Sequence, residues 1–149
     1  MVQAIEGLYV ALYTFAVVGC GAALLRARTI EQRDTRYGLV GLLAGSGGWA
    51  LFELGFLVSP AGVIRYVTYL FGLIVGLTTV GAWLYFCSAY TGRSFHQNTR
   101  YRRLAVGVYL AIVLVKVTNP LHGLYFTVEY STVPFAHPTV TYGLFHWVV

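Results

Sequence analysis

The chain has 149 residues, of which 58% are hydrophobic and only 10% are charged, and its formal net charge is +5. A soluble domain carries about 25% charged residues, so a soluble fold of this length would lack the polar surface to cover itself. The composition therefore indicates an integral membrane protein. The excess positive charge flanks apolar segments, so it fits orientation in a membrane better than binding of nucleic acid.

Four apolar segments are long enough, or nearly so, to cross a bilayer core, which is about 30 Å thick and needs about 20 helical residues. In chain order they cover residues 8–25, 37–58, 66–90 and 104–118. A fifth apolar segment starts at about residue 140, and the sequence ends within it after ten residues. We therefore predict an all-α fold: a multi-pass transmembrane helical bundle with four complete helices plus the start of a fifth, in a single domain over residues 1–149.

The arginines indicate how the helices are oriented. The loops at residues 26–36 and 91–103 contain four arginines each, whereas only Arg65 lies between the second and third segments and no Lys or Arg follows Lys116. Loops rich in Lys and Arg stay on the cytoplasmic side of a membrane. We therefore expect a cell-membrane protein whose two arginine-rich loops are cytoplasmic and whose N-terminus and residues 119–139 lie outside.

Glycines recur four residues apart inside two of the segments, as Gly41 and Gly45 in the second and Gly72 and Gly76 in the third. Small residues at this spacing allow two helix backbones to approach closely in lipid. Packing within one bundle is the favoured interpretation of this pattern, and a homodimer through these four glycines is the alternative.

No pattern typical of an enzyme is present. Cys20 and Cys87 lie inside apolar segments, and neither has a histidine at the spacing of a metal motif. No nucleotide-binding or hydrolase motif occurs, and no two of the five carboxylates are placed as an acid/base pair. The sequence therefore predicts no catalytic residues, no metal site and no cofactor.

Three charged residues lie in or beside the apolar segments: Glu53, Arg65 and Lys116. Counted from Arg36 and Arg103 at about 1.5 Å per residue, Glu53 and Lys116 both reach the outer half of the membrane. Arg65 and Lys116 could simply extend to the outer headgroups. Glu53 has a short side chain, so it needs a partner, a proton or a water-filled cavity. Two hypotheses follow: Glu53 pairs with Lys116 or Arg65 and is structural, or these residues line a pocket that opens outward.

Other polar or aromatic residues accompany these charges. Trp49 lies one helical turn before Glu53, on the same face. Asn119 and His122 follow Lys116, where Pro120 is expected to end the fourth helix. The predicted ligand-binding residues, for an unknown small ligand or membrane signal, are Trp49, Glu53, Arg65, Lys116, Asn119 and His122.

Three stretches in order, "GWALFELGFL", "LYFCSAYTGR" and "VTNPLHGLYF", resemble the seven-helix membrane sensor region at the N-terminus of some prokaryotic histidine kinases. The resemblance implies an outside N-terminus, and PAS and kinase modules after the seventh helix. Helices six and seven and the kinase are expected to be absent from this chain.

The function expected from the resemblance is a sensory input domain of a two-component histidine kinase, without the kinase part. The alternatives are a subunit of a transporter or channel, and a passive assembly subunit of a larger membrane complex.

Overall fold

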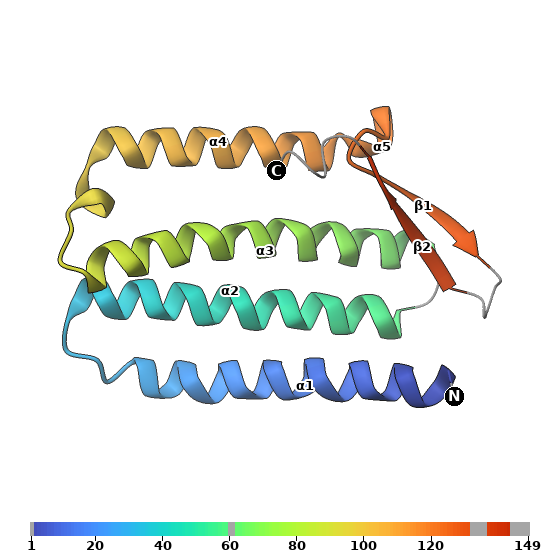
Figure 1. Cartoon of the computed structure of the whole chain (residues 1–149), viewed down its shortest axis with the longest axis horizontal. Coiled ribbons are helices and arrows are strands. Elements are labelled where there is room, and N and C mark those ends of the chain that lie inside the picture. The colour runs from blue at the N-terminus through green and yellow to red at the C-terminus, as the bar shows by residue number, and fades with distance from the viewer. Residues whose placement is uncertain (1, 60–61, 132–136, 144–149) are drawn as a thin grey trace.

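The structure, a computed structural model, describes residues 2–59, 62–131 and 137–143, and the side chains of residues 7–59, 62–126 and 143. Four long helices run antiparallel and lie side by side in chain order (Figure 1). They are α1 (Val2–Ala27), α2 (Arg33–Val58), α3 (Val63–Tyr90) and α4 (Thr99–Val117). The shorter elements are the 3₁₀ turn η1 (Phe95–Gln97), the single-turn helix α5 (Asn119–His122) and the strands β1 (Phe126–Ser131) and β2 (His137–Tyr142).

The predicted helical membrane bundle is confirmed. Three of the described helices are long and apolar enough to cross a bilayer, over Gly7–Ala27, Arg33–Val58 and Val63–Tyr90. The fourth predicted segment forms α4, which is not one of these three. All four long helices begin a few residues before the predicted segments, and in α2 and α4 the added residues are mainly polar. Large apolar side chains such as Phe15, which is 80% exposed, point away from the protein, as expected where lipid is the solvent.

The most extensive helix contact joins α2 to α3, and small residues form it. Gly38, Gly45 and Gly72 are buried there. A Cβ atom placed on Gly38 would lie only 2.6 Å from the Cα atom of Phe86, and one placed on Gly45 would lie 2.8 Å from the hydroxyl of Thr79. The two backbones are therefore closer than any larger residue at Gly38 would permit.

The four glycines considered for a homodimer contact neighbours within the chain. A Cβ on Gly41 would meet Ala82, and one on Gly76 would meet Trp49, at 3.4 and 3.3 Å. These glycines therefore serve the packing of α2 on α3. The homodimer through Gly41, Gly45, Gly72 and Gly76 stays a prediction.

A β-hairpin follows the fourth helix. α4 ends at Val117, next to Pro120 as expected, and Gly123 ends α5 in the left-handed conformation with φ of 61°. Strands β1 and β2 then pair antiparallel, from Phe126 opposite Tyr142 to Ser131 opposite His137.

The fifth helix predicted from about residue 140 is wrong for residues 140–142, which belong to β2. β-Branched and aromatic residues favour strands, and pairing with β1 satisfies those backbone groups of this segment that face β1. The remainder of that predicted helix, residues 144–149, lies outside the described residues.

The close α2–α3 contact can be tested at two glycines of α2, Gly38 and Gly41. Gly38→Ala should lower the thermal stability in detergent, because the new Cβ would press on the Phe86 backbone, and overpacking of this kind costs about 1–3 kcal/mol. Gly41→Ala is the matched control: its Cβ would meet only the Cβ of Ala82 at 3.4 Å, so stability should stay the same or rise. Equal melting temperatures for the two variants would contradict the close approach at Gly38.

Candidate functional site

The described part of the chain places its polar side chains mainly at the two ends of the helix row. We call the end that carries β1 and β2 the hairpin end, where α2 and α4 end and α3 begins (Figure 1). We call the opposite end the arginine end, because the loops at residues 26–36 and 91–103 lie there. Five of the six predicted ligand-binding residues lie in the last two turns of α2 or α4, in the first turn of α3, or in α5, all toward the hairpin end. Trp49 lies one turn further into α2.

An aromatic cluster attaches the hairpin to the helices. Phe126, the first residue of β1, is only 1% exposed. Its ring centroid lies 5.0 Å from that of Tyr69 and 5.5 Å from that of Tyr66, both on α3. Phe56 of α2 contacts Tyr69 with centroids 5.4 Å apart. The hairpin therefore sits on the α2–α3 pair through a continuous group of rings.

Asn119 fixes the start of the hairpin to the end of α4. Its side chain is buried, with 3% of the residue exposed. The amide nitrogen donates to the carbonyl of Phe126 at 2.7 Å, and the amide oxygen accepts from the N–H groups of Tyr125 and Phe126 at 2.9 and 3.2 Å. The Asn119 amide therefore supplies hydrogen-bond partners to three backbone groups that the tight turn leaves without backbone partners.

Lys116 is buried rather than extended to the membrane surface. The residue is 4% exposed, and its ammonium donates to the hydroxyl of Tyr125 at 2.6 Å. The same ammonium lies 4.3 Å from the centre of the Tyr125 ring. Burial raises the pKa of Tyr125, so this phenol stays neutral and able to accept the hydrogen bond. The interpretation that Lys116 reaches the outer headgroups is therefore wrong.

Trp49 and Glu53 lie together on the face of α2 that packs against α3. The Trp49 ring approaches Gly76 of α3, with Cδ1 3.3 Å from the position of a Cβ there. Glu53 approaches Gly72, with Oε1 3.7 Å from the position of a Cβ there. Trp49 also contacts Tyr13 of α1 edge to face, with centroids 6.3 Å apart. The expected shared face of Trp49 and Glu53 is therefore observed, and it lies where three helices meet.

Arg65 is engaged with the end of α2. Its Nε donates to the carbonyl oxygen of Ser59 at 3.1 Å, and Nη2 donates to the same oxygen. The guanidinium also lies over the Phe56 ring, 5.8 Å from its centre. Among the described side chains, neither Arg65 nor Lys116 forms an ion pair with Glu53. The structural pairing of Glu53 with either cation is therefore not observed.

His122 closes the corner between α4 and the hairpin. Its Nδ1 accepts from the N–H of Leu124 at 3.1 Å, so a neutral ring carries its proton on Nε2. Nε2 lies 3.2 Å from the hydroxyl of Thr118. The structure thus brings together Lys116, Asn119 and His122 at one corner and Trp49 and Glu53 at another. A shared ligand-binding role for all six residues stays a prediction.

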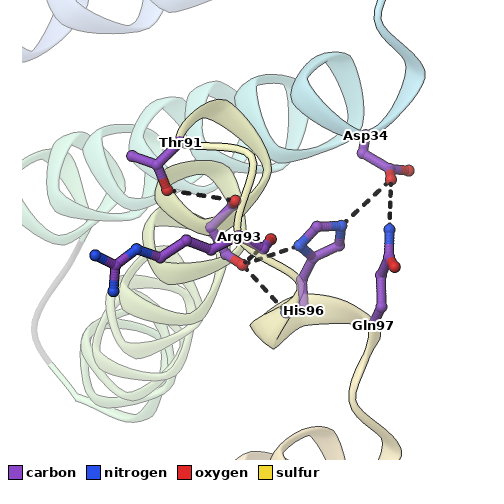
Figure 2. A network of polar contacts seen from close by, with 6 residues as sticks. Asp34, Thr91, Arg93, His96 and Gln97 are labelled. Carbon is purple, nitrogen blue, oxygen red and sulfur yellow. Dashed lines mark hydrogen bonds and ion pairs between the residues drawn. The ribbon is translucent and has the colours of Figure 1, made fainter.

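A second polar centre at the arginine end was missed from the sequence. Figure 2 shows His96, which lies on η1 in the loop that follows α3, next to Asp34 of α2. Its Nε2 lies 3.2 Å from Oδ2 of Asp34, and its Nδ1 lies 2.9 Å from the hydroxyl of Ser88. The His96 side chain is only 7% exposed. One signal was available: Asp34 and His96 fall in or next to the two arginine-rich loops, which were predicted to share one side of the membrane.

The hydroxyl of Ser88 connects His96 to the last turn of α3. It donates to the carbonyl oxygen of Arg93 at 3.0 Å and accepts from the backbone N–H of His96 at 3.2 Å. The same oxygen lies 2.9 Å from Nδ1 of His96. His96 therefore joins Asp34 of α2 to the end of α3.

A family model described as the N-terminal 7TM region of histidine kinase matches residues 8–149. Comparison with curated proteins finds no match, and comparison with solved structures finds none.

Loss of the Asn119 amide should release the hairpin. Asn119→Ala removes the acceptor of two backbone N–H groups and the donor to one carbonyl, and each buried loss costs about 1–3 kcal/mol. Hydrogen exchange at the Tyr125 and Phe126 amides should become at least about tenfold faster. Asn98→Ala removes an amide cap at the other end of α4 and serves as the control, since it should leave those two amides protected. Unchanged hydrogen exchange in Asn119→Ala would show that the Asn119 amide does not hold the hairpin to the end of α4.

The contact between His96 and Asp34 predicts a measurable coupling. A double-mutant cycle with His96→Ala and Asp34→Ala should give about 0.5–1 kcal/mol in the free energy of unfolding, near the low end for contacting residues because 42% of the Asp34 side chain is exposed. Glu31→Ala, which removes an exposed carboxylate from the same loop, should show no coupling to His96→Ala. Additive effects of the Asp34 and His96 substitutions would show that the contact contributes nothing.

Proposed function

We propose a sensory role for this chain, which belongs to the family of N-terminal 7TM regions of histidine kinases. In this role the chain is the membrane-embedded input domain of such a kinase, and it performs no chemistry itself. The hairpin end receives the stimulus, and the helices carry the change to the arginine end. The observation that carries this proposal is the buried contact of Lys116 with Tyr125, which ties the end of α4 to the start of the hairpin.

The orientation we propose places the hairpin end outside the cell and the arginine end in the cytoplasm. The loops at residues 26–36 and 91–103 hold four arginines each, whereas Arg65 and Lys116 are the cations at the hairpin end. Since Lys and Arg accumulate in cytoplasmic loops, this asymmetry supports the orientation. The kinase that acts on the signal would then lie on the side of the arginine end.

The ligand we propose competes for the contacts that hold the hairpin. A ligand with an acceptor group could replace the Tyr125 hydroxyl at the ammonium of Lys116, with Asn119 and His122 beside it. Trp49 and Glu53 lie at the separate corner where α1, α2 and α3 meet, so only a ligand that spans both corners would also contact them. A ligand shifts the domain only if it binds the docked and released forms of the hairpin with different affinity, and competition for Lys116 would provide that difference.

The fourth helix is the element that we propose to move. α4 packs on α3 far less extensively than α3 packs on α2. The middle of α4 is held by a hydrogen bond between the hydroxyls of Thr78 and Tyr109, 2.9 Å apart, and most of its other side chains are exposed. Release of Lys116 would therefore free α4 to shift or rotate against a rigid α2–α3 pair.

Two alternatives make different predictions. A transporter or channel subunit needs polar groups along a path through the membrane. Thr78 and Thr79 are the polar residues near the middle of α3, but their hydroxyls donate to carbonyls of the same helix, at 3.0 and 3.1 Å, and so do not line such a path. A passive assembly subunit would use the exposed apolar faces of the row for contacts with other chains. The loose attachment of α4 favours the sensory role over both.

The sensory role can be tested at Lys116. Lys116→Met keeps an unbranched side chain, one atom shorter than that of lysine, and removes the donor to Tyr125, so the released form of the hairpin should become more populated. In liposomes that contain the kinase bearing this region, the rate of autophosphorylation should change at least about threefold, corresponding to about 0.7 kcal/mol between the two forms. Tyr125→Phe should act in the same direction, because it removes the acceptor.

Arg100→Met is the matched control for this test. It makes the same kind of change on the same helix, at an exposed position of the arginine end, and should leave the rate within experimental error. Unchanged phosphorylation in Lys116→Met, with faster hydrogen exchange in the hairpin, would favour the assembly subunit. Solute flux through liposomes that contain the wild-type chain would favour the transporter.

A further inference from the structure

A cleft lies between α3 and α4 at the arginine end, away from the residues used in the proposed sensory role. Its volume is about 510 Å³, which is within the usual range for ligand sites. Gly81 and Leu84 of α3 and Ala105 of α4 form its apolar part. Arg93 and Arg102 line the same cleft from the loop and from the second turn of α4.

The cleft combines the depth and exposure expected of a site at the membrane surface. It follows the last turns of α3, a helix long and apolar enough to cross the bilayer, which ends at Tyr90. Leu84, Phe95 and Tyr101, which border the cleft, are 56%, 52% and 55% exposed. An apolar cleft at this depth is open to lipid along its length and to headgroups at its mouth.

The charge at the mouth is strongly positive. Residues 91–103 contain four arginines and no aspartate or glutamate. The Arg93 guanidinium lies over the Phe95 ring, 6.0 Å from its centre, and the Arg93 carbonyl is held by Ser88. The nearby carboxylate of Asp34 is already engaged by His96. The two arginines that line the cleft are therefore available to an anion from outside the chain.

We propose that this cleft binds one anionic phospholipid. The phosphate would lie between Arg93 and Arg102, and an acyl chain would lie along Gly81, Leu84 and Ala105. Basic pockets between membrane helices suit anionic headgroups, and a guanidinium can donate two parallel hydrogen bonds to a phosphate. The apolar lining can hold an acyl chain, which a small soluble anion lacks, so the cleft fits a lipid better than a free phosphate. This inference depends on the membrane location of the chain and is independent of the stimulus at the hairpin end.

The first experiment tests the headgroup. Native mass spectrometry of the purified chain in mild detergent, with phosphatidylglycerol and phosphatidylcholine added in equal amounts, should show one bound phosphatidylglycerol with at least about a tenfold preference. The double variant Arg93→Gln/Arg102→Gln should lose that preference. Arg28→Gln/Arg100→Gln is the control, since it has the same net charge and changes two exposed arginines outside the cleft.

The second experiment tests the tail. A Cβ atom on Gly81 would meet no atom within 4 Å beyond the neighbouring backbone of α3, so Gly81→Leu is expected to extend into the cleft rather than press on another helix. This variant should lose bound phosphatidylglycerol at least about tenfold while its melting temperature in detergent is unchanged or raised. Gly21→Leu on α1, where a Cβ also meets nothing within 4 Å, should bind the lipid as the wild type does.

Three results would overturn the proposal. Retention of the preference in Arg93→Gln/Arg102→Gln would show that the two arginines do not hold the headgroup. Displacement of the lipid by an equal concentration of glycerol phosphate or inorganic phosphate would identify a site for a soluble anion. A lipid-free dimer of the wild type that Gly81→Leu abolishes would identify a second copy of the chain as the occupant.

Discussion

The close approach of α2 to α3 is the contact on which the rest of the structure depends. In lipid, apolar side chains gain little by leaving the solvent, so helices associate through close van der Waals packing. Gly38 permits that packing because its missing side chain makes room for the backbone of Phe86. α1 then attaches to the free side of α2, and α4 to the free side of α3 (Figure 1). The hairpin rests on the same pair, since Phe126 contacts Tyr66 and Tyr69.

Two buried polar groups hold the ends of this framework together. At the hairpin end, Asn119 and Lys116 join α4 to the start of β1. At the arginine end, His96 joins the loop after α3 to Asp34 at the start of α2. Ring packing accompanies each group, between Phe126 and Tyr69 at one end and between Tyr85 and His96 at the other. The directional bonds add to this packing by fixing which backbone groups meet.

Much of the fold followed from segment length and from loop arginines, because a bilayer imposes both. The stop at Pro120 and the shared face of Trp49 and Glu53 also followed, since they depend only on local backbone geometry. The hairpin did not: its second strand was interpreted as the start of a helix, because composition alone does not distinguish an apolar strand from an apolar helix. The partners of Lys116 and His96 were missed, since each lies on a segment whose position tertiary contacts decide.

The two ends of α4 limit how this helix can move. α4 has 19 residues, or about 28 Å of helix, and because its first turns carry arginines it is not among the three helices apolar enough to cross a bilayer. Arg102 and Arg103 lie at one end, and the ammonium of Lys116 is bound to Tyr125 at the other. A shift by a full turn toward the hairpin would move Arg103 about 5.4 Å toward the hydrocarbon, where the cost of an arginine rises toward about 2.5–3.5 kcal/mol at the centre of a membrane helix. A rotation about the helix axis, or a shift of less than a turn, leaves each charged residue at nearly the same depth in the membrane. If α4 transmits a signal, rotation against α3 is therefore the motion that the charges of this helix allow.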